Sequence, residues 1–91
     1  MEKEVVTILM ATYNGEHYLQ EQLDSLQKQK YMGWKLIVGD DGSTDRTLEI
    51  LSRFQQECQN SVEIIKNDPP TGSAKANFMQ LLSKADTPYI M

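Results

Sequence analysis

The chain has 91 residues, of which 40% are hydrophobic and 24% are charged, and its formal net charge at pH 7 is -4. This length allows one domain at most, and such a chain buries roughly 60% or more of its unfolded surface, enough for a modest core. The acidic balance, without any cluster of Lys or Arg, argues against a surface that binds nucleic acid or an anionic membrane. The longest strongly apolar run, residues 5–11, is too short to cross a bilayer and lacks the features of a signal peptide, so we expect a cytoplasmic location.

Nearly continuous apolar runs predict strands that are buried on both faces of a parallel sheet. The first spans residues 5–11, the second residues 35–40 and the third residues 62–65, and a fourth begins at residues 89–91. Helical patterns separate these runs, so strands and helices alternate along the chain. The alternation is typical of an α/β fold, and we expect a Rossmann-like parallel sheet with helices on both faces.

Three amphipathic helices are predicted between the strands. The first covers residues 16–30, and its apolar stripe consists of Leu19, Leu23 and Leu26. Ser43 or Thr44 can cap the second helix, with Asp45 favourably placed in its first turn. Its inner face is expected to carry Leu48, Ile50, Leu51, Phe54 and Cys58. Ser73 is expected to cap the third helix, which carries Phe78, Leu81, Leu82 and Ala85.

The single cysteine and the single histidine do not indicate a reactive site. Cys58 has no partner for an internal disulfide and shares a helix face with Leu51, so we expect a buried structural thiol. His17 has no cysteine or second histidine at the spacing of metal ligands, and we expect it on the surface.

Polar segments follow the first three strands: residues 11–15 (ATYNG), 40–43 (DDGS) and 67–75 (NDPPTGSAK). In open parallel sheets, ligands bind beyond the carboxyl ends of the strands, which is where these segments lie. Asp40 and Asp41 could simply form a turn, but a helix N-terminus offsets only part of the repulsion between adjacent carboxylates, which favours a functional interpretation. Tyr13 is equally compatible with packing at the sheet edge, and Lys75 with a solvated lysine or an anion contact.

Several common sites are not indicated. The segment after the first strand has a single glycine, so neither a dinucleotide fingerprint nor a Walker loop is present. A metal site made of Asp40 and Asp41 alone is not expected, because adjacent residues at a strand end diverge and further ligands are not evident. The glycine and glutamate spacing of an EF-hand is also absent.

Two stretches carry a family resemblance: TILMATYNGEHYLQEQLDSL (residues 7–26) and WKLIVGDDGSTDRTLEIL (residues 34–51). Together they resemble the start of glycosyltransferase family 2, inverting enzymes of the GT-A fold, and the likeness covers essentially the whole chain. Met10-Ala11 stands where many members have Ile-Pro, and Gly39 where a larger apolar residue is usual. The form MATYNG and the pattern Gly-x-x-Lys-x-Asn-Phe at residues 72–78 are most similar to bacterial rhamnosyltransferase-type members.

The resemblance implies a set of nucleotide-binding residues: Ala11, Thr12, Tyr13, Asp40, Asp41 and Lys75. Asp41 matches the family's base-binding position, where a carboxylate accepts a hydrogen bond from the imide N–H of uracil or thymine, which cytosine lacks. Asp40 is expected to support the turn. The segment of residues 11–13 is similar to the wall along which base and ribose lie, and Lys75 occupies a region where members have a basic residue near the nucleotide.

The resemblance also implies what these 91 residues do not contain. Members carry an Asp-x-Asp metal motif after the strand that begins at Tyr89, and a later carboxylate acts as general base. We therefore expect residues 1–91 to be the N-terminal, incomplete nucleotide-sugar-binding part of a glycosyltransferase domain, with no catalytic residue or metal ligand and no activity of its own. A UDP- or dTDP-sugar donor, bacterial surface polysaccharide synthesis and a Mn²⁺ or Mg²⁺ ion in the full-length parent are implied as well.

The sequence allows comparison with two other classes of protein. The chain could be a stand-alone, non-catalytic nucleotide-binding or interaction module. A receiver-type signalling domain also uses paired aspartates in an α/β sheet, but it places them after the first strand and has a phosphoacceptor aspartate after the third, unlike this chain.

We also expect the chain to self-associate. A Rossmann-like strand order of 3-2-1-4 makes the first strand central, yet the fourth offers only residues 89–91 to pair with it. The first strand would then present an apolar edge. Apolar side chains of the first or third helix are expected to remain partly uncovered, namely Leu19, Leu23 and Leu26 or Phe78 and Leu82.

Overall fold

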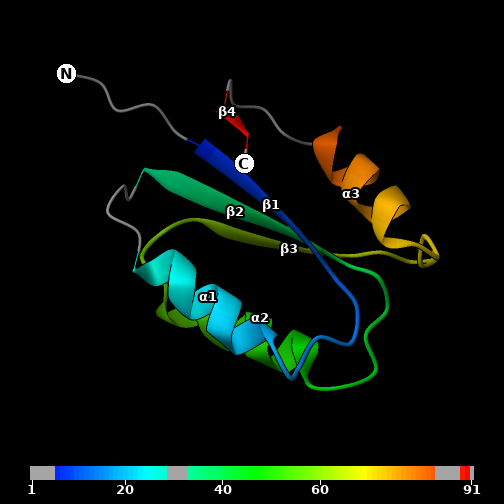
Figure 1. Ribbon diagram of the computed structural model, residues 1–91, viewed down its shortest axis with the longest axis horizontal. Helices are drawn as coiled ribbons and strands as arrows, with labels where there is room; N and C mark the ends of the chain where they lie inside the picture. The colour runs from blue at the N-terminus through cyan, green and yellow to red at the C-terminus, as the bar shows by residue number, and fades with distance from the viewer. Residues whose placement is uncertain (1–5, 29–32, 84–88, 91) are drawn as a thin grey trace.

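The computed structural model describes residues 6–28, 33–83 and 89–90. Its elements in chain order are β1 (Val6–Thr12), α1 (Leu19–Gln27), β2 (Trp34–Asp40), α2 (Thr47–Glu57), β3 (Val62–Lys66), α3 (Ala74–Leu82) and β4 (Tyr89–Ile90). The strands form one sheet in the order β3-β2-β1-β4, and every pairing is parallel (Figure 1). The predicted alternation of elements and the predicted strand order are both confirmed.

Helices cover both faces of the sheet, as expected, but unequally. Figure 1 shows α1 and α2 lying together on one side and α3 alone on the other. Because successive strand residues point to opposite faces, Ile8 packs with α1 and α2 whereas its neighbour Leu9 packs with Leu81 of α3. The face under α1 and α2 therefore holds the larger part of the core.

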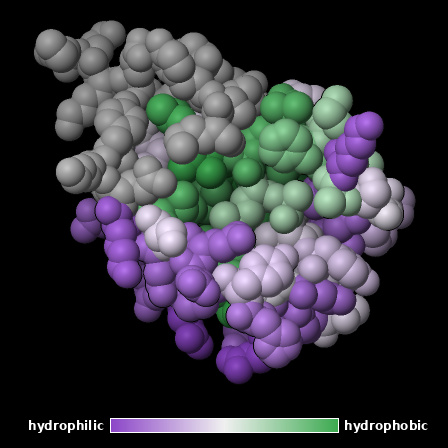
Figure 2. All heavy atoms as spheres, viewed as in Figure 1, coloured by the Kyte–Doolittle hydropathy of each residue, from purple (hydrophilic) through white to green (hydrophobic). Residues whose placement is uncertain are grey.

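The apolar stripe of α1 is fully used in that core. Leu19 and Leu23 are completely buried and Leu26 nearly so, and burying a leucine side chain contributes about 1.5–3 kcal/mol. Of the two sets of side chains expected to remain partly uncovered, these leucines are covered, because α1 and α2 together close their face of the sheet. On α3, by contrast, Leu81 is buried while 38% of Phe78 is exposed. Figure 2 shows apolar residues gathered at the surface in the part of the view where α3 lies in Figure 1.

The first two helices begin later than the sequence predicts. The Gly15 carbonyl accepts hydrogen bonds from the Tyr18 and Leu19 N–H groups, so a turn precedes α1. Neither Ser43 nor Thr44 caps α2; the Asp45 carboxylate accepts the Thr47 N–H at 2.9 Å instead. The cap of α3 is as predicted, since the Ser73 hydroxyl accepts the Ala76 N–H at 3.0 Å.

The positions of Cys58 and His17 agree in part with the sequence prediction. Cys58 follows the last residue of α2 in an extended conformation and is half-buried against the core, rather than fully buried inside the helix. His17 is exposed, as expected, and Ala85 lies outside the described residues. No helix in the described part of the chain has the length and apolar character to span a bilayer.

Candidate functional site

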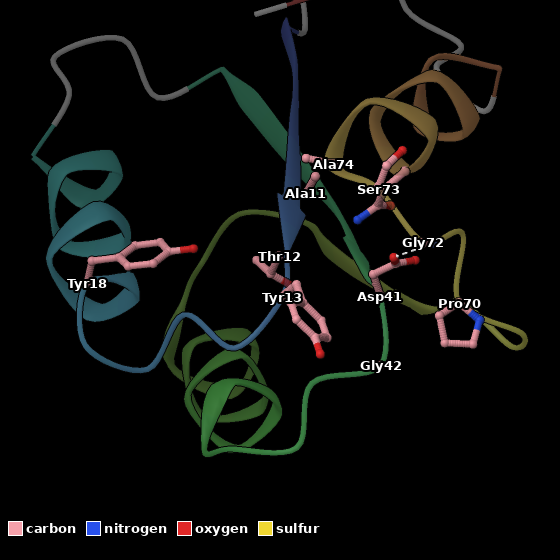
Figure 3. Close-up of a pocket in the computed structure, with 11 residues that line it drawn as sticks. Ala11, Thr12, Tyr13, Tyr18, Asp41, Gly42, Pro70, Gly72, Ser73 and Ala74 are labelled. Atoms are coloured by element: carbon pink, nitrogen blue, oxygen red, sulfur yellow. Dashed lines mark hydrogen bonds between the residues drawn. The ribbon is translucent and has the colours of Figure 1, made fainter.

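A pocket of about 580 Å³ lies at the carboxyl ends of β1 and β2. It is lined by residues 11–13, 41–42, 70 and 72–74, together with Tyr18 and Asn77. These residues come from the end of β1 and the loop after it, the loop after β2, the segment that joins β3 to α3, and α3 itself (Figure 3). The pocket thus lies where ligands bind in open parallel sheets, as the three polar segments predict.

Asp40 does not line the pocket, and its side chain holds the ends of β1 and β2 together. Its side chain is buried, and its Oδ1 atom accepts the Thr12 hydroxyl at 2.7 Å and the Ser43 hydroxyl at 2.6 Å. Its Oδ2 atom accepts the N–H groups of Gly42 at 3.2 Å and Ser43 at 2.9 Å. A carboxylate has about four acceptor sites, so Asp40 is saturated by protein donors and supports the turn.

Asp41 lines the pocket and binds a different loop. Its Oδ1 atom accepts the Thr71 N–H at 2.6 Å and the Asn67 amide at 3.1 Å, and its Oδ2 atom accepts the Gly72 N–H at 3.0 Å. The Thr71 N–H is the main cause that lowers the pKa of Asp41, with the amide of Asn67, the Thr71 hydroxyl and the Gly72 N–H acting in the same direction against the effect of burial. Asp41 is therefore ionised at neutral pH, and it accepts two N–H donors on Oδ1 and one on Oδ2.

The loop after β1 is bound to the loop after β2 by reciprocal hydrogen bonds. The Asn14 N–H donates to the Ser43 hydroxyl at 2.8 Å, and the Thr44 N–H donates to the Asn14 side-chain oxygen at 2.7 Å. Asn14 has φ of 49°, a conformation that asparagine tolerates better than most residues. Ser43 and Thr44 are thus used to position this loop, and with it Tyr13, rather than to cap α2.

Two tyrosines stand at the open side of the pocket. Tyr13 is 60% exposed and Tyr18 is 46% exposed, although both line the pocket. Figure 3 shows Tyr13 beyond the end of β1 and Tyr18 reaching in from the start of α1, with Asp41 on the other side of β1. Gly15 lets the Tyr18 ring lie close, since a Cβ atom there would come within 2.7 Å of Tyr18 Cζ. Exposed aromatic faces next to an ionised acceptor suit a flat ligand that carries hydrogen-bond donors.

The structure brings together most of the residues expected from the sequence. The pocket is lined by Ala11, Thr12, Tyr13 and Asp41. Asp40 supports it through its hydrogen bond with Thr12. Lys75 is exposed on α3 and does not line the pocket.

Sequence reasoning did not identify Tyr18, Asn77 or Asn67 as site residues. Tyr18 lines the pocket from the start of α1, and its only sequence signal is an aromatic residue next to the apolar stripe. Asn77 is 2% exposed on the inner face of α3, where a polar residue among apolar ones is itself a signal. Asn67 contacts Asp41 although it does not line the pocket, and the sequence gives no sign of that contact.

The pocket as described does not fit a divalent cation. In the described part of the chain, no group of three or more His, Cys, Asp or Glu side chains is placed to hold a metal ion. The four acceptor sites of Asp40 and three of those of Asp41 already accept protein donors.

The sequence matches the model of a known protein family. The model of the family described as "Glycosyl transferase family 2" matches residues 7–91. The chain belongs to glycosyl transferase family 2. The predicted family resemblance is confirmed.

Individual relatives agree with this assignment. The dTDP-rhamnosyl transferase RfbG of Shigella flexneri is 39% identical over 85% of this chain, and the putative glycosyltransferase EpsE of Bacillus subtilis is 35% identical over 93%. The chain spans 27% and 30% of the lengths of these two relatives. The crystal structure of S. aureus TarS 1-349 in complex with UDP superimposes with a TM-score of 0.84 at 25% identity, covering 98% of this chain and 26% of that one. The α/β fold is therefore that of the GT-A glycosyltransferases.

Acid is predicted to release the loop that joins β3 to α3. The pKa of Asp41 in the folded chain lies below its ordinary value of 3.8, so the stabilisation from its hydrogen bonds is complete above that value and is lost as the pH falls through the lower folded value. In an NMR titration, the amide protons of Thr71 and Gly72 should change shift together, with a midpoint below pH 3.8. The Asp41→Asn variant should lack this titration. A midpoint above 3.8 would contradict the proposed cause.

Proposed function

We propose that this chain provides the nucleotide-sugar-binding part of an inverting glycosyltransferase, which transfers a sugar from a nucleoside-diphosphate sugar to an acceptor hydroxyl in bacterial surface polysaccharide synthesis. Family membership supports the reaction class. The observation that carries the proposal is the Asp41 carboxylate, which is ionised, lines the pocket and accepts one backbone N–H on Oδ2.

The donor nucleotide is proposed to be UDP or dTDP. An ionised acceptor binds the imide N–H of uracil or thymine through a charge-assisted hydrogen bond, whereas the corresponding ring nitrogen of cytosine is itself an acceptor and is repelled. Two similar proteins support this choice. One relative is a dTDP-rhamnosyl transferase, and the TarS structure contains UDP.

The other pocket residues are proposed to bind the rest of the nucleoside. Ala11 and Thr12 form the wall beside Asp41, and the exposed ring of Tyr13 gives the base an apolar face. Lys75 is exposed in the first turn of α3, outside the pocket wall. Its proposed role is limited to attracting the anionic diphosphate from the rim.

Replacement of each aspartate should show which of the two contacts the nucleotide. Asp41→Asn should lower the affinity for UDP by about tenfold or more, because a neutral acceptor replaces a charged one and the amide nitrogen presents a donor to a donor. Asp40→Asn should lower the free energy of unfolding by about 1–3 kcal/mol, because its amide would face donors that the carboxylate accepts. Calorimetric titration with UDP and urea denaturation measure the two effects.

The outcome that contradicts the assignment is specific. If the folded Asp40→Asn chain loses as much UDP affinity as Asp41→Asn, or more, then Asp41 is not the base-contacting residue. CDP serves as the matched control ligand, since its weaker binding should be less affected by Asp41→Asn.

The family resemblance implies Mn²⁺ or Mg²⁺ for the reaction of the parent enzyme, but the described pocket lacks ligands for it. We expect UDP binding by these 91 residues to depend on base and ribose contacts and to change little when Mn²⁺ is added. Titrations with Mn²⁺ and with EDTA measure this directly. A large gain in affinity with Mn²⁺ that is lost in a carboxylate variant of this chain would show that the metal site lies within it.

Self-association of the 91-residue chain is proposed from the edge of β1. The pairing of β1 with β4 involves only Val6 and Thr7, so the described strands leave the rest of that edge, residues 8–12, without a partner. The exposed Phe78 and Met79 of α3 add apolar surface. Sedimentation velocity should show a weight-average mass that rises with concentration. A monomer at all concentrations, with slow amide exchange along residues 8–12, would contradict the proposal.

A further inference from the structure

Two buried asparagines connect the backbone of β2 to Asp41. The Asn77 Nδ2 atom donates to the Gly39 carbonyl at 2.8 Å, and the Asn67 Nδ2 atom donates both to Asn77 Oδ1 at 2.9 Å and to Asp41 Oδ1 at 3.1 Å. Only 8% of Asn67 and 2% of Asn77 are exposed. We call Gly39, Asn77 and Asn67 the amide relay.

The amide relay has a single polarity. The Gly39 carbonyl can only accept, so Asn77 must turn its nitrogen toward Gly39 and its oxygen toward Asn67. Asn67 must then direct its nitrogen to Asn77 and Asp41, while its own oxygen accepts the Gln80 amide at 3.3 Å. A backbone carbonyl of the sheet thus determines that Asp41 Oδ1 meets a donor.

Gly39 makes the close approach of Asn77 possible. A Cβ atom at this position would lie 2.5 Å from Asn77 Oδ1 and 3.0 Å from Leu81 Cδ2. Any side chain at residue 39 would therefore displace the amide of Asn77 and, through it, that of Asn67. Neither Gly39 nor Asn67 lines the pocket.

The amide relay contacts Oδ1 of the Asp41 carboxylate. Asn67 and the Thr71 N–H occupy both acceptor sites of Oδ1, whereas Oδ2 accepts the Gly72 N–H. The Thr71 hydroxyl also acts on the carboxylate. We propose that the amide relay is a positioning device for nucleobase selection, which holds Oδ1 so that Oδ2 is presented to an imide N–H in the pocket. This inference rests on the proposed function and assigns Asn67, Asn77 and Gly39 as positioning residues that select uracil over cytosine.

The test compares UDP with CDP in variants that leave Asp41 intact. Asn67→Ala removes the donor to Oδ1, and Gly39→Ala displaces Asn77 without removing any atom of the relay. Calorimetric titration should show that each variant loses about tenfold in the ratio of UDP to CDP affinity, equivalent to about 1.4 kcal/mol. The pKa of Asp41, followed by carboxyl ¹³C NMR, should rise in both variants, since the Asn67 amide lowers it.

Asn60→Ala is the matched control. The Asn60 side chain also donates to a carbonyl of β2, at 2.8 Å, but that carbonyl belongs to Trp34 at the opposite end of the strand. This variant should keep both the UDP-to-CDP ratio and the Asp41 titration. Melting curves establish whether each variant is folded. If Asn67→Ala does not fold, the UDP-to-CDP ratio of Gly39→Ala tests the inference.

The two proposals fail in different ways. If the wild-type chain prefers UDP and Asn67→Ala lowers UDP and CDP affinity by the same factor, the relay is merely structural and the inference is overturned, while the proposed function stands. If the wild-type chain does not distinguish UDP from CDP, base selection by Asp41 is wrong, and base selection by the relay falls with it. The carboxyl titration still decides whether Asn67 holds Asp41.

Discussion

The structure depends on two adjacent carboxylates at the end of β2 that point in opposite directions. Asp40 turns toward β1 and the turn after β2, and Asp41 turns toward the loop between β3 and α3. Successive residues of an extended strand point to opposite faces, so the two charges do not share a site. Each charge is stabilised by its own set of hydrogen-bond donors, which bind the end of β1, the loop after β2 and the loop between β3 and α3 to one strand end.

The opposite orientations of Asp40 and Asp41 change how the adjacent carboxylates are interpreted. Repulsion between neighbouring carboxylates is a cost, which in the sequence alone favours a functional interpretation. In the structure the carboxylates diverge and accept separate donors, so the pair is compatible with stability on one side and with ligand binding on the other. Asp40, with its four protein donors, is the structural member. Asp41 remains the candidate for ligand binding because it alone of the two lines the pocket.

The two faces of the sheet divide stability and function in the same way. On one face, α1 and α2 close a core of leucines, isoleucines and valines around Trp34 and Phe54. On the other face, α3 packs through a single buried leucine, Leu81, and next to it the buried Asn77 takes part in the hydrogen bonds around Asp41. A buried amide stabilises only when its donors and acceptors are satisfied. The α3 face therefore has less apolar contact than the other face, and its buried amides orient the polar groups near the pocket.

The sequence by itself determined the order of elements, the parallel sheet and the edge at which the pocket lies. Apolar periodicity is a local property, so runs such as residues 62–65 identify strands, and the i, i+4, i+7 spacing of Leu19, Leu23 and Leu26 identifies a helix. The resemblance to the family motifs also identified Asp41 and Tyr13 as candidate nucleotide-binding residues. Only the tertiary structure decided that Ser43 binds the loop after β1 instead of capping α2. The same holds for the contact between Asn77 and Gly39, which lie 38 residues apart. Such contacts depend on how the loops and α3 meet across the sheet, and a local pattern of residues carries no information about that.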